Sequence, residues 1–243
     1  MRITFHHMVR SERVKAILCG VAALLMAVPV SAQVGHEPED SPYRDLQHRQ
    51  ELTLLGGWVK ARHDPAGVAP QSAPMVGARY EFNLTGPLSL SSDVTAMFAD
   101  RDVIDPSKPK AQRIPRTEGA TVFAADLALA MNLTGRKSWH HLVPQVRGGI
   151  GLLRSSAADD SSGFRFGTPF AFSFGGGLKL VPGRTGRVQL RADFTDRLFK
   201  LSYPDSYYRL ASDNTAVLDR STAKSFYTHH AVFSVGLSYL FGR

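Results

Sequence analysis

The chain has 243 residues, with 29 Lys and Arg side chains against 21 Asp and Glu, which gives a formal net charge of +8. Its single cysteine, Cys19, lies in the N-terminal segment, so the rest of the chain cannot be a disulfide-stapled scaffold and must be stabilised by burial or backbone pairing. The basic excess is too modest to predict nucleic-acid binding in an exported protein. It fits contact with anionic lipid headgroups, or plain solubility.

Residues 1–32 have the pattern of a cleaved secretory signal. Basic residues precede an apolar run from Ala16 to Val30, and Val30-Ser31-Ala32 forms a small-residue cleavage site. The apolar run of about 15 residues is shorter than the roughly 20 that a membrane-anchoring helix needs. Residues 33–47 are polar, contain proline and show no apolar period, so we expect a flexible N-terminal tail there.

From residue 48 onward the chain repeats one pattern, in which a strand-length stretch of alternating hydrophobicity is followed by turn residues. One face of each stretch is apolar, whereas charged side chains fall on the other face. Alternation alone fits either a lipid-facing barrel or a soluble sandwich with its apolar face inward. The eight predicted strands cover about 51–62, 76–84, 88–99, 123–133, 145–152, 170–180, 188–198 and 230–243.

The connections between these strands alternate strictly between short and long. An up-and-down barrel in an outer membrane has this asymmetry, with short periplasmic turns at one rim and long external loops at the other. Backbone groups in hydrocarbon must be paired internally, so we expect the last strand to pair with the first and close the sheet. The sequence therefore predicts an all-β fold, an eight-stranded antiparallel up-and-down transmembrane β-barrel over residues 48–243.

Several of these strands resemble those of the small OmpA/OmpX-like outer-membrane β-barrels. For this chain we expect the barrel alone, without a peptidoglycan-binding domain. The resemblance is carried by strands rich in Gly, aromatics and alternation at 144–151, 174–180 and 190–196, and by the ending Val235-Gly-Leu-Ser-Tyr-Leu-Phe-Gly242. It implies location in the outer membrane of a Gram-negative-type cell. It also implies assembly by the outer-membrane insertion machinery, which in this family reads a C-terminal aromatic. Here Phe241 is followed by two residues, a departure from a strictly terminal Phe.

The polar faces of the strands carry charges of both signs, which the barrel would place inside. Side chains just fill the interior of an eight-stranded barrel, so these charges must pair with one another or meet water. We predict a salt-bridged polar plug, with a narrow ion pathway as the alternative; the sequence does not say which charges pair. The predicted interior charges are Glu51, Arg79, Glu81, Asp93, Asp126, Arg147, Lys179, Arg191, Asp193 and Arg197.

Aromatic residues near strand ends on the apolar face predict an interfacial girdle, with core packing in a soluble barrel as the alternative. These girdle residues are Trp58, Tyr227, Tyr239 and Phe241. The loop 101–118 carries five basic side chains that could hold lipopolysaccharide phosphates, although an ordinary solvated loop has the same composition. The tyrosine-containing loop 200–225 suits contact with another molecule.

Two histidine pairs, His140-His141 and His229-His230, invite comparison with metal or acid–base sites. Adjacent residues on a strand point to opposite faces, so the two members of a pair cannot share a metal ion. His230 and Ser234 share a face but lie about four residues, roughly 13 Å, apart along the strand, too far for the hydrogen bond of a catalytic triad. We therefore predict no metal site, no cofactor and no catalytic residues.

The sequence thus predicts a monomeric, non-enzymatic outer-membrane barrel that supports envelope integrity or surface interaction through its long external loops. Its expected partners are outer-membrane lipid, lipopolysaccharide and the insertion machinery, and not nucleic acid. Three alternatives stay open: an outer-leaflet lipid-modifying enzyme, a small ion channel, and a soluble periplasmic barrel with an apolar cavity.

Overall fold

The computed structural model describes residues 41–114, 116–157, 162–181 and 187–242. The secretory signal predicted for residues 1–32, and the tail as far as residue 40, lie outside the described residues. Within the described ranges, no helix has the length and apolar character needed to cross a membrane. Helical structure in these ranges consists of two short 3-10 turns, η1 (Lys110–Gln112) and η2 (Asp205–Tyr208).

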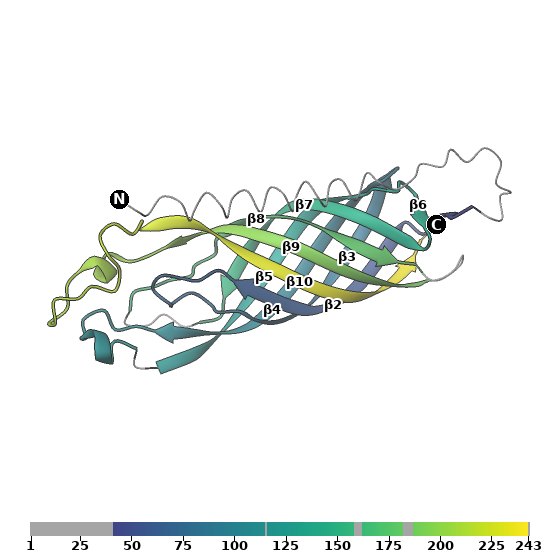
Figure 1. Cartoon of the computed structure of the whole chain (residues 1–243). Coiled ribbons are helices and arrows are strands. Elements are labelled where there is room, and N and C mark those ends of the chain that lie inside the picture. The colour runs from purple at the N-terminus through teal and green to yellow at the C-terminus, as the bar shows by residue number, and fades with distance from the viewer. Residues whose placement is uncertain (1–40, 115, 158–161, 182–186, 243) are drawn as a thin grey trace, which may run out of the picture. The chain divides into compact units, whose positions relative to one another are not determined.

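Eight antiparallel strands form a closed barrel (Figure 1). Successive strands of the barrel are hydrogen-bonded neighbours, and the last pairs with the first. The prediction of an all-β, up-and-down, eight-stranded barrel is therefore confirmed. The barrel strands are β2 (Gln50–Ala61), β3 (Ala73–Thr85), β4 (Leu88–Val103), β5 (Arg116–Asn132), β7 (Leu142–Ser155), β8 (Phe170–Leu180), β9 (Val188–Ser202) and β10 (Ser225–Phe241).

Two further strands extend one rim of the barrel. β1 (Tyr43–Asp45) pairs antiparallel with β6 (Lys137–Trp139), and β6 leads into β7 through a tight two-residue turn. Part of the segment expected to be a flexible tail is thus paired with the rim, because its backbone groups bond to the edge that β6 offers.

The closing seam lies between β10 and β2. Their register runs from Phe241 opposite Gln50 to His230 opposite Ala61, so the two strands pair over the whole length of β2. Pairing of the first and last barrel strands removes both free edges, which a sheet in hydrocarbon cannot leave unpaired.

The outer surface of the barrel is apolar and the inner surface is polar. Many large apolar side chains point outward and are exposed. Their exposed fractions range from 37% for Leu88 to 68% for Leu54. The alternating side chains of the same strands point inward and are buried. Hydrophobic burial in water cannot account for this arrangement, because an exposed apolar surface of this extent needs a hydrocarbon environment to cover it.

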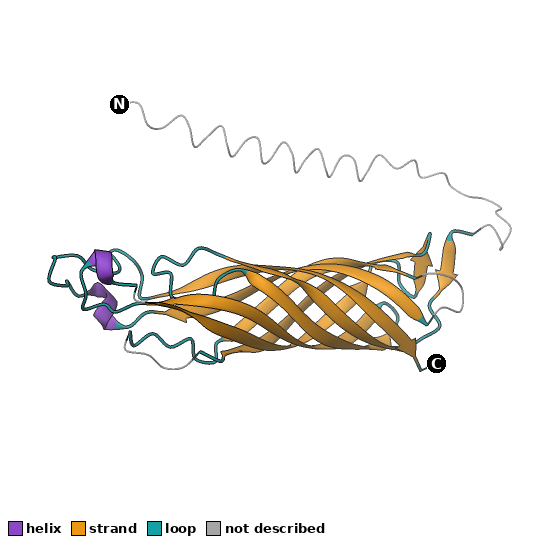
Figure 2. Cartoon of the chain, turned by 90° about the horizontal axis from the view of Figure 1, so that it is seen from below, coloured by secondary structure: helices purple, strands orange, loops and turns teal. Residues whose placement is uncertain are grey.

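The connections separate by length between the two ends of the barrel (Figure 2). A two-residue turn connects β3 to β4, and seven residues separate β8 from β9 in the sequence, whereas the opposite end carries the longer connections loop 1 (62–72), loop 2 (104–115), loop 3 (156–169) and loop 4 (203–224). β4, β5, β9 and β10 extend farther toward the long loops than predicted. Backbone pairing continues beyond the apolar band there, because paired strands remain stable in water when their outward side chains are polar.

Candidate functional site

All ten charges predicted to lie inside the barrel are buried in the structure. Five are acidic (Glu51, Glu81, Asp93, Asp126 and Asp193) and five are basic (Arg79, Arg147, Lys179, Arg191 and Arg197), so this set has no net charge. A neutral set can be buried only if its members meet opposite charges and hydrogen-bond donors or acceptors within the lumen. The contacts in the lumen fall into three groups, each built around one or two cations.

The first group surrounds Lys179 near the end of the barrel with the short turns. Lys179 Nζ lies 2.8 Å from Glu51 Oε2 and 2.6 Å from Glu81 Oε1. Arg191 Nη1 lies 2.9 Å from Glu51 Oε1 and 3.4 Å from Glu81 Oε2, and its Nη2 donates to Gln145 Oε1 at 3.0 Å. Two cations from β8 and β9 thus meet two carboxylates from β2 and β3 across the lumen.

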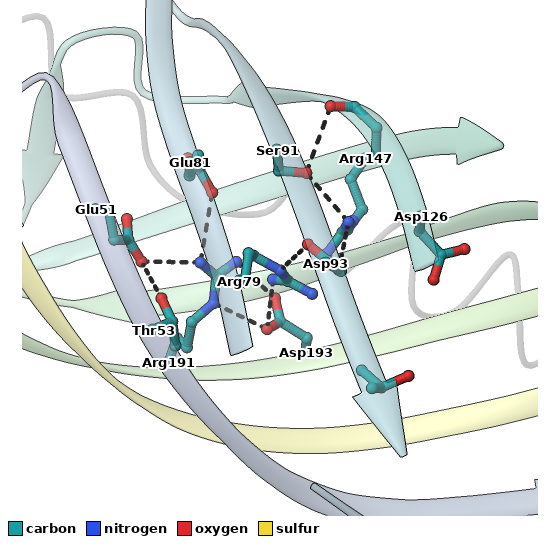
Figure 3. A network of polar contacts seen from close by, with 12 residues as sticks. Glu51, Thr53, Arg79, Glu81, Ser91, Asp93, Asp126, Arg147, Arg191 and Asp193 are labelled. Atoms are coloured by element: carbon teal, nitrogen blue, oxygen red, sulfur yellow. Dashed lines mark hydrogen bonds and ion pairs between the residues drawn. The ribbon is translucent and has the colours of Figure 1, made fainter. Parts of the chain in front are cut away.

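The second group lies in the middle of the lumen, where two arginines and two aspartates alternate (Figure 3). Arg79 Nε lies 2.8 Å from Asp93 Oδ1, and Arg79 Nη1 lies 3.0 Å from Asp193 Oδ2. Arg147 Nη2 lies 2.8 Å from Asp93 Oδ2. Asp193 also accepts from Arg191, at 2.9 and 3.1 Å, and this joins the first two groups into one network of eight charges.

The third group is a separate pair toward the long loops. Arg197 Nη2 lies 2.7 Å from Asp126 Oδ2 and donates to Thr95 Oγ1 at 3.2 Å. The Nε atoms of Arg147 and Arg197 and the hydroxyl of Ser173 have no hydrogen-bond partner in the described part of the chain. All three residues line a cavity of about 20 Å³, a size that fits one water molecule with several polar partners.

Glycines in the inner face make room for these side chains. A Cβ atom on Gly177 would lie 2.2 Å from Asp193 Oδ1, and one on Gly151 would lie 2.4 Å from Asp126 Oδ1. The missing side chain at each position thus lets a neighbouring carboxylate lie flat against the sheet. The Gly-rich strands of the sequence are part of the polar interior rather than of a ligand-binding loop.

Between the Arg197–Asp126 pair and the long loops, the inner face becomes apolar. This apolar region was not among the predictions from the sequence. Inward side chains of the strands pack there against residues of the long loops and close the lumen. A signal was available, since apolar residues occupy inward register positions at the loop ends of these strands. The cluster includes Leu55, Val59, Met75, Met97 and Phe199 from strands and Val68, Phe164, Tyr203, Tyr207 and Leu218 from loops.

Loop 1 is fixed to this apolar cap by Asp64. Its carboxylate accepts hydrogen bonds from the backbone N–H groups of Ala66 and Ala69, at 3.0 and 2.7 Å, and from the hydroxyl of Tyr203. Burial, together with the adjacent Asp64 carboxylate, raises the pKa of the Tyr203 phenol. Tyr203 therefore stays protonated and donates to Asp64, joining loop 1 to loop 4.

Loops 2 and 4 are docked onto each other by the buried side chain of Arg113. Its guanidinium donates to the backbone oxygens of Ala216 at 2.8 Å and Thr215 at 3.1 Å, and to the hydroxyl of Thr215 at 2.7 Å. The backbone N–H of Lys110 donates to Asp213 Oδ2 at 2.8 Å. Of the basic side chains in the predicted loop 101–118, Arg113 is thus turned toward loop 4.

Arg101 is also turned inward from that loop. It is buried, and its guanidinium pairs with Glu118, with Nη2 lying 2.5 Å from Oε1. The remaining basic side chains of this stretch, Lys108, Lys110 and Arg116, are exposed. The cationic surface of loop 2 is therefore smaller than its composition suggests.

The predicted girdle residues all lie on the outer face. Trp58, Tyr227 and Tyr239 are exposed, and Phe241 is partly covered by Tyr80 and Tyr239, with ring centroids at 6.4 and 6.2 Å. Tyr239 Oη accepts a hydrogen bond from Arg187 at 3.2 Å. Tyr239 and Phe241 lie near the short-turn rim, whereas Trp58 and Tyr227 lie toward the loop end.

The histidine pairs lie at opposite ends of the barrel. His140 and His141 form the turn between β6 and β7, both with positive φ, whereas His229 points outward and His230 points into the lumen. Ser234 is also buried on the inner face. Across the residues that the structure describes, no group of three His, Cys, Asp or Glu side chains is placed to hold a metal ion.

Comparisons with known proteins give only structural similarities. No family model matches the chain, and no curated protein matches it. The chain is similar in structure to Neisserial surface protein A, with 13% identity, a TM-score of 0.48, and coverage of 79% of this chain and 97% of that one. It is also similar to the outer membrane protein OprG from Pseudomonas aeruginosa, with 10% identity, a TM-score of 0.49, and coverage of 84% and 100%.

The geometry itself defines the class of protein. The chain forms a closed, eight-stranded, antiparallel barrel with an apolar exterior and an ion-paired interior. This is the fold of the small outer-membrane β-barrels, and the resemblance noted from the sequence is confirmed at the level of fold.

Proposed function

We propose that the protein is a monomeric, non-enzymatic outer-membrane barrel that holds a docked loop cap at the cell surface and supports envelope integrity or surface interaction. The observation that carries this proposal is the contrast between the two faces of one sheet. The outer face exposes large apolar side chains, whereas the inner face buries ten charges of zero net sum. This contrast suits a barrel surrounded by lipid and is the reverse of a soluble barrel.

A structural role is favoured over ion conduction because the lumen is filled. Eight of the ten interior charges form one network, and the apolar cap lies above it. Two cavities that border this network have volumes of about 20 and 40 Å³, room for single waters rather than for a hydrated ion.

The partners proposed for this barrel are lipid, lipopolysaccharide and the insertion machinery. Phe241 is the last residue of the closing strand, which suits a signal that is read before the seam with β2 forms. The exposed cations Lys108 and Lys110 of loop 2 and Arg116 at the start of β5 are available to anionic groups of lipopolysaccharide.

Cell fractionation and surface proteolysis test the proposal together. We expect the protein in the outer-membrane fraction, with slower gel migration after boiling in detergent, and cleavage within loop 2 or loop 4 when intact cells are treated with protease. Recovery in the soluble periplasmic fraction, or identical migration before and after boiling, would contradict it. Altered lipid A or phospholipid in a deletion strain would instead favour the lipid-modifying alternative.

A further inference from the structure

The outer face of β2, β10 and β9 ends in an aromatic row toward the long loops. These three strands lie side by side (Figure 1), and their register places Trp58 opposite Phe233 and Phe233 opposite Phe194. The rings of Phe194 and Phe233 lie 5.0 Å apart, and all three side chains are exposed. On β10, the outward residues on the short-turn side of Phe233 are apolar too, so this row belongs to the loop-side part of the apolar band.

The next outward row toward the loops is polar at both ends and small in the middle. Lys60 lies opposite Ala231 on one side, and Asp196 lies opposite Ala231 on the other. Ala231 carries only a methyl group between the Lys60 and Asp196 positions, and the aromatic row lies next to this row on its short-turn side.

Asp196 holds a histidine that lies farther toward the loops than Ala231. His229 Nδ1 lies 2.7 Å from Asp196 Oδ2, and because a carboxylate only accepts, Nδ1 carries the proton and Nε2 is left for another partner. The side chain of Asp196 is 17% exposed, against 47% for His229. Asp196 Oδ1 is buried without a hydrogen-bond partner among the described residues.

Further exposed cations lie toward the long loops along β9 and beyond the end of β2. Arg62 directly follows β2, and Lys200 lies opposite Tyr227 in the ladder of β9 and β10. Lys60, Arg62 and Lys200 are exposed, and none of them has an ion-pair partner in the part of the chain that the structure describes. Three exposed cations without an ion-pair partner among the described residues, together with His229, thus lie toward the long loops from the aromatic row.

We propose that this surface binds the phosphate headgroup of an anionic phospholipid. We name it the headgroup patch, and it consists of Lys60, Arg62, Asp196, Lys200 and His229. The phosphate accepts hydrogen bonds from Lys60 and the neighbouring cations, at an interface where charge-assisted pairs are stronger than in bulk water. A headgroup hydroxyl donates to the free His229 Nε2, and the acyl chains lie over the aromatic row.

This inference rests on the proposed function, because it requires the loop end of the barrel to meet the outer leaflet. Trp58 lies beside the patch and reports on nearby lipid. The chain has two tryptophans, and the other, Trp139, lies in β6 at the opposite rim. A Trp139→Phe variant therefore leaves Trp58 as the sole reporter of quenching by lipids with brominated chains.

The test compares brominated phosphatidylglycerol with brominated phosphatidylcholine, each as a minor component of unlabelled phosphatidylcholine vesicles that contain the Trp139→Phe protein. We expect phosphatidylglycerol to be enriched next to Trp58 by roughly fivefold or more, the effect expected from one favourable cation near an anionic headgroup. Lys60→Ser with His229→Ser should remove most of this preference, and Lys60→Glu should abolish it. Lys137→Ser, which removes an exposed cation at the opposite rim, should leave it unchanged.

Each outcome bears on a different statement. Equal quenching of Trp58 by the two lipids overturns the headgroup patch. Quenching by either lipid still shows that the protein is inserted in the bilayer, which supports the proposed function. A preference retained by Lys60→Glu also overturns the patch, because quenching by brominated phosphatidylcholine shows in the same sample that the variant is inserted. No quenching by either lipid overturns the patch and the proposed function together.

Discussion

At the scale of single residues, the buried charges inside this barrel neutralise one another through ion pairs across the lumen. The side chain of Arg191 has no exposed surface and contacts two glutamates and an aspartate, which come from three different strands. Burying such a group costs several kcal/mol unless its partners compensate. Each member is therefore tolerated only in the presence of the others.

Removal of Arg191 should show this interdependence. We expect Arg191→Met to lower the free energy of unfolding by about 3–5 kcal/mol, because Glu51 and Glu81 would be left buried with a single cation between them. The measurement is urea unfolding in lipid vesicles, followed by tryptophan fluorescence. The control is Arg187→Met, which removes a guanidinium on the outside of the barrel. Equal loss in the two variants would contradict this account.

The inner glycines should be sensitive to the smallest added side chain. Gly177→Ala places a methyl group 2.2 Å from Asp193 Oδ1, so we expect the carboxylate to be displaced and stability to fall by about 1–3 kcal/mol in the same unfolding assay. Gly56→Ala is the matched control, since a Cβ there meets no atom within 4 Å. If Gly56→Ala lowered stability as much as Gly177→Ala, the loss would come from replacing a glycine in a strand and not from the displaced Asp193 carboxylate.

At the scale of elements, the long loops are folded onto the barrel and onto one another. Loop 1 and loop 4 share the Asp64–Tyr203 hydrogen bond, and loop 2 holds loop 4 through Arg113. Long loops are usually mobile because their backbone polar groups are satisfied by water. Here the Asp64 carboxylate accepts from backbone N–H groups of loop 1 and Arg113 donates to carbonyl groups of loop 4, so these loop segments are held in a defined shape.

Loss of the Arg113 contacts should release loop 4. We expect Arg113→Ala to increase the rate of loop 4 cleavage by proteinase K several-fold in detergent-solubilised protein, with the barrel left intact as a protected core. Arg116→Ala is the control, since its side chain is exposed and its one described contact, with Glu118, measures 3.4 Å. Unchanged cleavage of loop 4 in the Arg113 variant would show that Asp64 and the apolar cap suffice.

At the scale of the whole molecule, the barrel separates two environments on the two faces of one sheet. Its exterior matches hydrocarbon, and its lumen contains a neutral network beneath an apolar cap. An ion crossing the lumen would have to break several buried ion pairs without receiving a hydration shell in return.

Conductance measurements should therefore give no channel activity. After reconstitution into planar bilayers, we expect the current to stay at the level of the bare membrane over the voltages that open porins. The control for insertion is the boiling-dependent gel shift of the same preparation. Discrete conductance steps that disappear in an Arg79→Met variant would identify the lumen as a pathway and overturn the plug.

Much of the fold was predictable because the information is local. A strand of period two shows its apolar and polar faces in its own sequence, so the eight strands and the interior charges could be read without knowing any partner. The sorting of short and long connections gave the topology, and the closing seam followed because a sheet in hydrocarbon cannot keep an edge. Strand ends were less certain, since pairing continues past the apolar band in β4 and β10.

The sequence by itself thus determined which residues form strands, which face of each strand meets lipid, and that charges of both signs lie inside. Only the tertiary structure decided that Arg191 joins Glu51 to Asp193, that Arg113 turns into loop 4, and that Phe199 lies under a cap of loop residues. The physical reason is that these contacts cross the lumen or join loops far apart in sequence. Tilt and register of the closed barrel set them, and no single strand encodes either.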